Sequence, residues 1–159
     1  MSKKIILGSD KTGYQLKEDL KKHLTEKGHE VEDIGMYPEE ESRPYFESAK
    51  RLAPRIQSGE FEKGILCCGT GMGMAIVANK FKGIYASVVE SSFPAKMCKI
   101  VNNANVLTLG GWLTATRQAT DMVDNWLEAS FTEGFPEDRQ EFLKNALDEI
   151  KKIENENFK

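Results

Sequence analysis

The stretch from Lys63 to Lys80 constrains the fold of this chain more than any other part of the sequence. It starts with a short apolar run, Ile65 to Cys67, which is typical of a buried strand. Gly69, Gly71 and Gly73 follow at every second position, and an apolar, alanine-rich segment that favours a helix comes next. The stretch therefore predicts a buried strand that passes through a tight glycine turn into a helix.

Such a turn directs several backbone N–H groups at one point, where they suit a phosphate, a carboxylate or an enolate oxygen. Cys68 lies directly before the turn, where the same field favours its thiolate form. The spacing is neither the dinucleotide-binding fingerprint nor a P-loop, because no Gly-Lys-Ser/Thr follows. A turn that merely needs small residues explains the glycines equally well. The position of Cys68 favours chemistry at this turn.

Apolar runs alternate with helical patterns along most of the remaining chain, which indicates a parallel sheet covered on both faces. We expect a three-layer, Rossmann-like α/β fold with five parallel strands. Thr114 is a candidate cap for the helix that follows the last strand. The strands are predicted at 4–8, 31–34, 64–67, 83–89 and 105–109. The helices are predicted at 12–27, at 44–57, from the glycine turn to about 79, at 93–101 and from 115 onward.

In parallel sheets, ligands bind beyond the carboxyl ends of the strands. Asp10 and Cys68 end the first and third predicted strands, which we expect to be neighbours across a crevice. The sequence also predicts that the Asn102–Asn103 region lies on this edge. Trp112 follows the fifth strand, and it fits the crevice or the core equally well.

The C-terminal segment, residues 134–159, differs in character from the rest of the single predicted domain, 1–159. Pro136, Glu137 and Asp138 suit the first turn of a helix. Apolar residues then form a helical stripe through a charged segment. We predict an extra C-terminal helix that packs on a partner subunit.

The bulk composition argues against several functional classes. The net charge is −3, and the 22 Lys and Arg residues are spread among the acids, so no nucleic-acid or membrane surface is indicated. We expect a cytoplasmic protein without signal peptide or membrane span. The three cysteines form no disulfide framework and no zinc pattern, so no metal site is expected.

Three motifs resemble the family of ribose-5-phosphate isomerase B and the two galactose-6-phosphate isomerase subunits. The chain has GSDKTG at 8–13, where that family opens with Gly-x-Asp-x-x-Gly. The segment LCCGTGMGMAIVANK at 66–80 is very similar to the central signature of the family, and NNANV at 102–106 matches a third motif. The resemblance covers nearly the whole chain.

The resemblance implies interconversion of an aldose phosphate and a ketose phosphate without metal or cofactor. A base removes a proton next to the carbonyl, and a cis-enediolate forms whose oxygen must be held by preorganised donors. Cys68 matches the family's base. The donors would be the backbone N–H groups of the turn, which belong to Gly69, Gly71, Met72, Gly73 and Met74.

The remaining matches assign contacts with the sugar. Thr70 would orient the substrate or move a proton between its oxygens, and Asp10 would bind sugar hydroxyls. Asn102 would reach the substrate from a partner subunit. The resemblance thus implies a homodimer or a dimer of dimers.

The chain also departs from the family. Members that open a ring sugar commonly have His where this chain has Val101, which cannot carry a proton. Of two arginines that usually grip phosphate, Arg139 is retained and Phe135 replaces the other. Lys11 and Arg43 are expected to supply cationic charge lost elsewhere, which fits a shorter or open-chain sugar. Lys11 is equally well explained as a solvated side chain near a helix start.

We therefore expect an aldose–ketose isomerase, with ribose 5-phosphate and ribulose 5-phosphate as the default pair. Another phosphosugar of four to six carbons, including that of a galactose-6-phosphate isomerase subunit, is an alternative. A catalytically silent phosphosugar-binding protein is a further alternative, because a His and an Arg are missing. The sequence leaves the length, stereochemistry and ring form of the sugar open.

Overall fold

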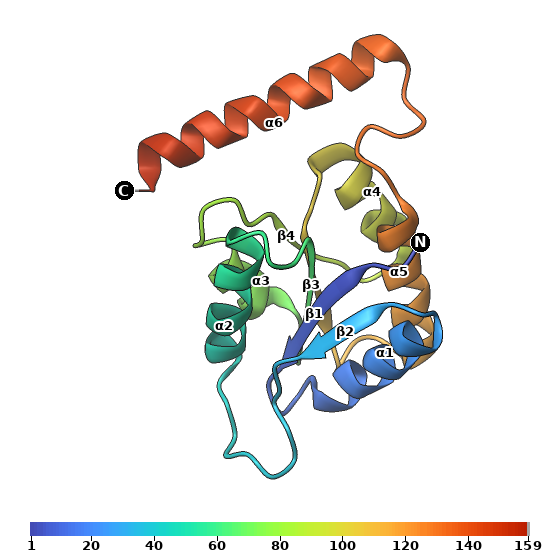
Figure 1. Ribbon diagram of the computed structural model, residues 1–159, viewed down its shortest axis with the longest axis vertical. Helices are drawn as coiled ribbons and strands as arrows, with labels where there is room; N and C mark the ends of the chain where they lie inside the picture. Colours follow the sequence, from blue (N-terminus) through green and yellow to red (C-terminus); the bar gives the residue numbers. More distant parts are fainter. Residues whose placement is uncertain (159) are drawn as a thin grey trace.

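A computed structural model describes residues 1–158 and has three layers, with one parallel sheet between two layers of helices (Figure 1). Residue 159, the end of the predicted segment 134–159, lies outside the described residues. The elements in chain order are β1 (Lys4–Ser9), α1 (Tyr14–Glu26), β2 (Glu30–Asp33), α2 (Tyr45–Gln57), β3 (Lys63–Cys68), α3 (Met72–Ala78), β4 (Ala86–Val88), α4 (Ser92–Asn102), β5 (Val106–Gly110), α5 (Thr116–Glu128) and α6 (Glu137–Asn157).

The five strands are all parallel, in the order β2-β1-β3-β5-β4. This confirms the predicted α/β fold and the pairing of the first strand with the third. Ser9 lies opposite Cys67, and Cys68 lies opposite Gly110. The chain leaves β1 toward β2 on one side and returns to β3 on the other. The carboxyl ends of β1 and β3 therefore form a topological switch point, where open α/β sheets bind ligands.

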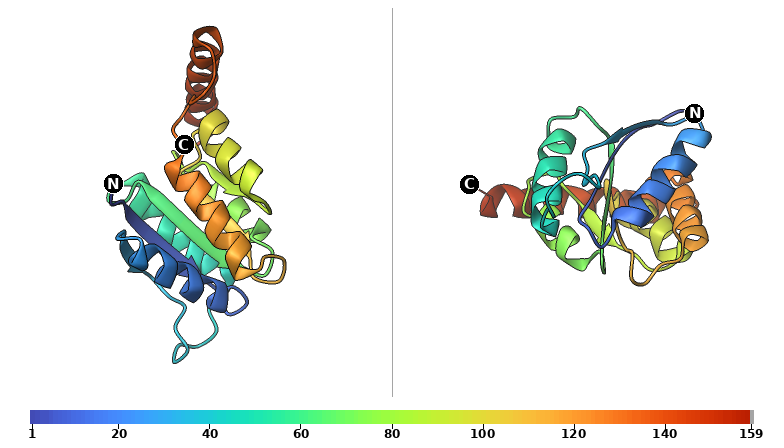
Figure 2. Two further views of the ribbon diagram at one scale, coloured as in Figure 1. Left: turned by 90° about the vertical axis from the view of Figure 1, so that its right-hand side faces the viewer. Right: turned by 90° about the horizontal axis from the view of Figure 1, so that it is seen from below.

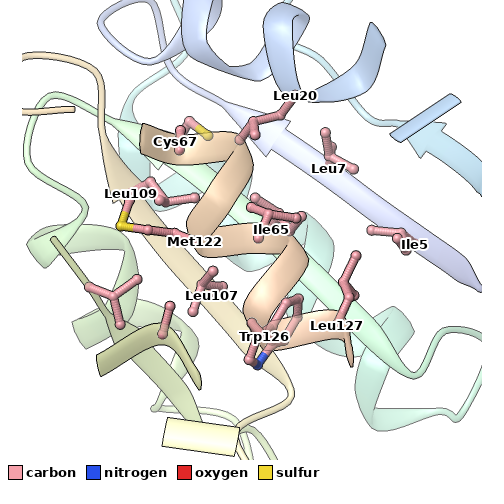
Figure 3. Close-up of a cluster of buried hydrophobic side chains, with 14 of the residues drawn as sticks. Ile5, Leu7, Leu20, Ile65, Cys67, Leu107, Leu109, Met122, Trp126 and Leu127 are labelled. Carbon is pink, nitrogen blue, oxygen red and sulfur yellow. The ribbon is translucent and has the colours of Figure 1, made fainter. Parts of the chain in front are cut away.

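Helices α1, α4 and α5 cover one face of the sheet (Figures 1 and 2). Alternate strand residues point into this layer, and Trp126 of α5 is fully buried among them (Figure 3). Its indole Nε1 donates a hydrogen bond of 3.2 Å to the carbonyl of Ala104, which satisfies the one polar atom of the ring. The strand residues of this core are Ile5, Leu7, Ile65, Cys67, Leu107 and Leu109.

Helices α2 and α3 cover the other face, where Leu66 and Cys68 point. Because side chains alternate along a strand, adjacent Cys67 and Cys68 face opposite layers. Cys67 is fully buried in the layer of α1, α4 and α5. Cys68 lies beside α3, next to the glycine turn, as its place in the sequence predicted.

Two of the differences from the predicted boundaries have a cause in the hydrogen bonds. β4 begins only at Ala86, because the side chain of Asn105 bonds the carbonyl of Gly83 and the N–H of Tyr85. Thr114 does not cap α5, since its own N–H bonds the carbonyl of Gly110 in the turn after β5. The helix starts later, with Ala115 at the N-cap position and no side-chain cap.

Helix α6 projects from the amino-terminal edge of the sheet and crosses beyond α4 (Figures 1 and 2). Its Leu143 and Leu147 are buried, whereas Phe142, Ile150 and Ile153 of the same stripe are exposed. Glu154 accepts a hydrogen bond of 2.6 Å from the N–H of Gly83. One chain therefore covers only part of the stripe, and packing of the rest on a partner stays a prediction. No helix within residues 1–158 is long and apolar enough to span a bilayer.

A buried ion pair fixes the loop that follows β2. The ammonium of Lys17 has no exposed surface and lies 2.6 Å from Asp33 and 2.7 Å from Glu18. Asp33 also bonds Lys21 at 2.9 Å and the N–H of Gly35 at 2.8 Å. Burial acts to raise the pKa of Asp33, but the hydrogen bonds from Lys17, Lys21 and Gly35 outweigh burial and hold the pKa below its usual value.

We expect Asp33→Asn to lower the free energy of unfolding by about 3 kcal/mol, because it removes the main counter-charge of a buried ammonium. Urea denaturation at neutral pH measures this loss. The folded state holds Asp33 at a depressed pKa, so its contribution is present above the unfolded pKa and is lost as pH falls through the folded value. The difference in the free energy of unfolding between Asp33→Asn and the wild type therefore becomes smaller in acid.

Asp148→Asn is the matched control, because the side chain of Asp148 is 65% exposed and, in the described part of the chain, pairs with Lys151 alone. It is expected to change stability by less than about 0.5 kcal/mol. If Asp33→Asn behaved like this control, or kept the same offset at every pH, the ion pair would not fix the loop.

Candidate active site

The turns after β1, β3 and β5 meet at the carboxyl edge of the sheet and bond one another through their backbones. The N–H of Asp10 donates to the carbonyl of Cys67 at 3.2 Å. The N–H of Gly111 donates to the carbonyl of Cys68 at 2.7 Å, and that of Trp112 donates to Gly69 at 3.0 Å. Cys68 is thus held between the turns of both neighbouring strands.

Glycine is required where these turns approach most closely. A Cβ atom at Gly13 would lie 2.1 Å from the carbonyl oxygen of Cys67, which no side chain tolerates. Gly71 has φ +78°, in the left-handed region that favours glycine, and its Cβ would lie 3.0 Å from the backbone of Leu109. The glycines of both motifs therefore have a packing role in addition to any role with a ligand.

Cys68 forms the centre of the site. Its side chain is 5% exposed, and its Sγ accepts a hydrogen bond of 3.0 Å from the N–H of Gly71. A donor at this distance stabilises negative charge on sulfur. The sequence predicted donors in the turn and a thiol at its mouth, and the structure brings the two into contact.

The other backbone donors of the turn are used differently. The N–H of Met72 bonds the hydroxyl of Thr70 at 3.3 Å, and that of Ala75 bonds the carbonyl of Gly71 at 3.2 Å. Gly73 and Met74 lie in the first turn of α3, where N–H groups have no partner within the helix. No hydrogen bond to another part of residues 1–158 uses these two donors, so they are available to an anionic oxygen.

Asp10 lies at the end of β1, half-buried, and shapes the first turn. Its Oδ1 accepts hydrogen bonds from the Thr12 hydroxyl at 2.7 Å and the N–H of Gly13 at 3.0 Å. Its Oδ2 has no hydrogen-bond partner within residues 1–158, so it remains available to a hydroxyl of a ligand. Lys11 is exposed beside it.

Two aromatic rings form walls around the glycine turn. The indole of Trp112 lies over Gly69, where an added Cβ would be 2.7 Å from its Cε3, and the side chain is 70% exposed. Trp112 therefore lines the crevice and is not part of the core. The ring of Tyr45, at the start of α2, lies over Gly73 in the same way, 2.7 Å from an added Cβ. Nothing in the sequence indicated that Tyr45 belongs to the site, because Gly73, which its ring covers, is distant along the chain.

Arg43 is already paired within the chain. It is buried, and its guanidinium donates to the carbonyl of Ile34 at 2.8 Å and to both carboxylate oxygens of Glu40 at 2.8 and 2.9 Å. This pairing ties the acidic loop back to β2. Arg43 therefore does not present a free cation to a ligand, contrary to the expectation that it replaces lost charge.

The Asn102–Asn103 region does not lie at the edge that carries Cys68, so that prediction is wrong within one chain. Asn102 is the last residue of α4, which returns to the amino-terminal edge before β5 begins. Asn102 and Arg139 instead line a groove of about 180 Å3 between α4 and α6. The other residues of the groove are Val101, Phe142, Leu143, Ala146, Leu147 and Ile150.

The three cysteines differ in their surroundings. Burial raises the pKa of Cys67, which has no exposed surface, and burial also raises the pKa of Cys98 on α4. Cys68 alone bonds a backbone N–H of the glycine turn. Within the described part of the chain, no group of three His, Cys, Asp or Glu side chains is arranged to hold a metal ion.

Comparisons with known proteins agree on one relationship. A family model described as Ribose/Galactose Isomerase matches residues 5–143. The chain is 50% identical over 151 residues to the 4-deoxy-4-sulfo-D-erythrose isomerase of Clostridium sp. (strain MSTE9), covering 95% of each chain. It is 39% identical over 141 residues to ribose-5-phosphate isomerase B of Escherichia coli (strain K12), covering 89% of this chain and 94% of that one.

Solved structures show the same relationship. The ribose-5-phosphate isomerase B of Mycoplasma genitalium with bound ribulose-5-phosphate superposes with a TM-score of 0.87 at 32% identity. The match covers 99% of both chains.

The surroundings of the cysteines predict their order of reaction with iodoacetamide in the folded protein. We expect Cys68 to be alkylated first, Cys98 more slowly and Cys67 last, because thiolate formation is disfavoured in the two apolar sites. Peptide mass spectrometry over a time course measures the order. Cys68→Ser serves as the control and should remove only the fastest phase; equal rates at Cys67 and Cys68 would contradict the prediction.

Proposed function

Because this chain belongs to the Ribose/Galactose Isomerase family and is an aldose–ketose isomerase, we propose that its substrate is a four-carbon sugar with a terminal anionic group. The reaction moves a proton between two adjacent carbons. The 4-deoxy-4-sulfo-D-erythrose of the 50% identical relative is the type of substrate that we favour.

Cys68 is the base in this proposal. Its thiolate takes the proton from C2 of the open-chain aldose and returns it to C1, and the ketose results. The observation that carries this assignment is the hydrogen bond of 3.0 Å from the N–H of Gly71 to Sγ, at the point where three turns converge. Sulfur receives and releases the proton without moving, as a positioned base must.

The negative oxygen of the cis-enediolate lies against the glycine turn. The N–H groups of Gly73 and Met74 have no partner within α3, and that of Gly69 lies in the same turn. The N–H groups of Gly71 and Met72 already bond Cys68 and Thr70. Preorganised donors of this kind stabilise an oxyanion as it forms. Thr70, which bonds the N–H of Met72, carries a hydroxyl that can pass a proton between the two substrate oxygens. Asp10 binds a sugar hydroxyl through its free Oδ2.

The residue at position 101 supports a substrate that needs no ring opening. Ribose 5-phosphate closes a furanose ring through its C4 hydroxyl, so an enzyme that uses this ring form needs a group to open it. A four-carbon aldose whose C4 carries a sulfonate or phosphate has no hydroxyl with which to close a five-membered ring. Valine, which cannot transfer a proton, is therefore compatible with an open-chain substrate.

Ribose 5-phosphate is the second candidate. The 39% identical relative is named ribose-5-phosphate isomerase B, and the Mycoplasma genitalium structure contains ribulose-5-phosphate. The glycine turn and Cys68 serve either sugar equally well, because the proton transfer is the same. Phosphosugars of six carbons and a catalytically silent binding role remain the alternatives that a substrate panel must also test.

The complete site contains residues of two subunits in this proposal. Asn102 and Arg139 match family positions that contact substrate, yet in one chain they lie at the opposite edge of the sheet from Cys68. A second copy would place them beside Cys68. The exposed side chains of Trp112, Leu113 and Ile76 supply apolar surface for such a contact. Lys11, exposed beside Asp10, is a candidate for the anionic end of the substrate.

We expect the purified protein to exchange solvent deuterium into at least one sugar of a panel that contains 4-deoxy-4-sulfo-D-erythrose, erythrose 4-phosphate, ribose 5-phosphate and galactose 6-phosphate. The four-carbon compounds should react with the highest kcat/KM. Cys68→Ala should lower kcat by at least about a hundredfold, because a positioned base contributes that much or more. NMR measures both the exchange and the isomerisation.

Cys67→Ala is the matched control, since Cys67 is adjacent but points to the opposite layer, and it should keep most of the activity. Fastest turnover of ribose 5-phosphate would replace the four-carbon proposal with the second candidate. Exchange that survives in Cys68→Ala would refute the base assignment, and tight binding without exchange on any sugar would indicate the silent protein.

Mixed dimers test the shared site. Cys68→Ala and Asn102→Ala should each be nearly inactive alone, because each removes one residue from both sites of a dimer. After refolding of an equal mixture, half of the dimers are mixed and one of their two sites is intact, so about a quarter of wild-type activity should return. Mixing Cys68→Ala with Thr70→Ala, two changes in the same turn, should restore nothing, and equal recovery in both mixtures would argue against the shared site.

A further inference from the structure

The lysine at the start of β3 has no partner that explains its burial. Lys63 is 6% exposed, and its Nζ makes no hydrogen bond within residues 1–158. The amine lies 4.7 Å from the ring centroid of Trp126, on the face of the sheet that Ile65 also points into. A buried lysine without an ionic partner is costly, and an apolar side chain would be more stable here. The fold alone therefore does not account for Lys63.

A second lysine lies in the same depression. Lys63 and Lys99 line a hollow of about 350 Å3 at the amino-terminal edge of the sheet, together with Ile56, Gly59, Phe61, Glu62, Tyr85, Asn103 and Asn105. Lys99, in the last turn of α4, is half-buried and bonds the side-chain oxygen of Asn103. The side chain of Asn105 is already engaged with Gly83 and Tyr85. The Nζ of Lys63 has almost no accessible surface, so an anion that enters the hollow beside Lys99 would have to draw this amine toward it.

Burial and the neighbouring positive charges favour the neutral form of the Lys63 amine. Burial, together with the positive charges of Lys99 and Lys3, lowers the pKa of Lys63 to about 7, against the opposing effect of Glu62. Glu62 is exposed and does not bond the amine. An anion between the two lysines would supply the missing counter-charge to both.

We propose that Lys63 and Lys99 form a binding site for a phosphate-like oxyanion at the amino-terminal edge of the sheet. The site is separate from the glycine turn, because Lys63 and Cys68 are the first and last residues of β3. Five residue steps place them about 17 Å apart along the strand. The ligand is recognised by its doubly charged oxyanion group, either as free phosphate or as the phosphoryl group of a small metabolite.

Binding at this site is coupled to proton uptake. Above neutral pH the amine of Lys63 is mostly neutral, and a bound dianion raises its proton affinity, so Lys63 becomes an ammonium as the ligand enters. The indole of Trp126 then faces the cation, in a contact that favours the charged form. A phosphate that binds only at the glycine turn takes up no proton at Lys63.

Isothermal titration calorimetry of the full chain with inorganic phosphate tests the site. Titrations at pH 8 in buffers of different ionisation enthalpy should show a Kd of about 1 mM or tighter and an uptake of about one proton per chain. In Lys63→Met, which has similar length and no charge, this binding and the proton uptake should disappear, with isomerase kcat and KM unchanged. Lys99→Met should weaken binding by about tenfold.

Lys22→Met is the matched control, because it removes a surface lysine charge on α1 far from the hollow and should titrate like wild type. A second series of titrations uses glycerol 3-phosphate. If this ester binds, the site recognises the phosphoryl group of a small metabolite; if only inorganic phosphate binds, the site recognises free phosphate. Absence of proton-linked phosphate binding at millimolar concentration, or proton-linked binding that Lys63→Met leaves intact, would overturn the proposal and leave Lys63 as a structural partner of Trp126. Neither result depends on which sugar the enzyme isomerises.

Discussion

The close packing of three turns at the carboxyl edge of the sheet is the constraint on which the site depends. The turn after β3 lies between those after β1 and β5, and the backbones approach so closely that Gly13 has no room for a side chain beside Cys67. The backbone bonds between these turns fix the position of Cys68 and the direction of the Gly71 N–H. These backbone contacts would keep the proposed base in place through the reaction, as preorganised catalysis requires.

Strand β3 carries a different titratable residue at each of its two ends. β3 carries Cys68 at its carboxyl end and Lys63 at its amino end, with an apolar run between them. Because Lys63 is buried at the amino end of this strand, its protonation responds strongly to neighbouring charge. Lys17 is also buried, but unlike Lys63 it has an ionic partner, Asp33, and several hydrogen bonds stabilise the two charges within the fold.

The site residues near one another in sequence were predictable, and those that meet only through the fold were not. Cys68 and the glycine turn form one continuous segment, so their local geometry follows from the chain itself. Tyr45 and Trp112 reach the same turn from α2 and from the segment after β5, and only the packing of those elements brings them there. Arg43 was expected to meet a ligand, but Glu40, three residues away, satisfies its guanidinium first.

The sequence by itself determined the layered α/β fold, the strand–turn–helix unit that holds Cys68, and the family to which the chain belongs. These follow from local periodicity and from glycine spacing, which depend on short stretches of chain. The tertiary structure alone decided that Asn102 and Arg139 lie away from Cys68, and that the amine of Lys63 is buried with no hydrogen-bond partner among residues 1–158. Burial and long-range contact depend on how distant segments pack, and no short stretch of sequence contains that information.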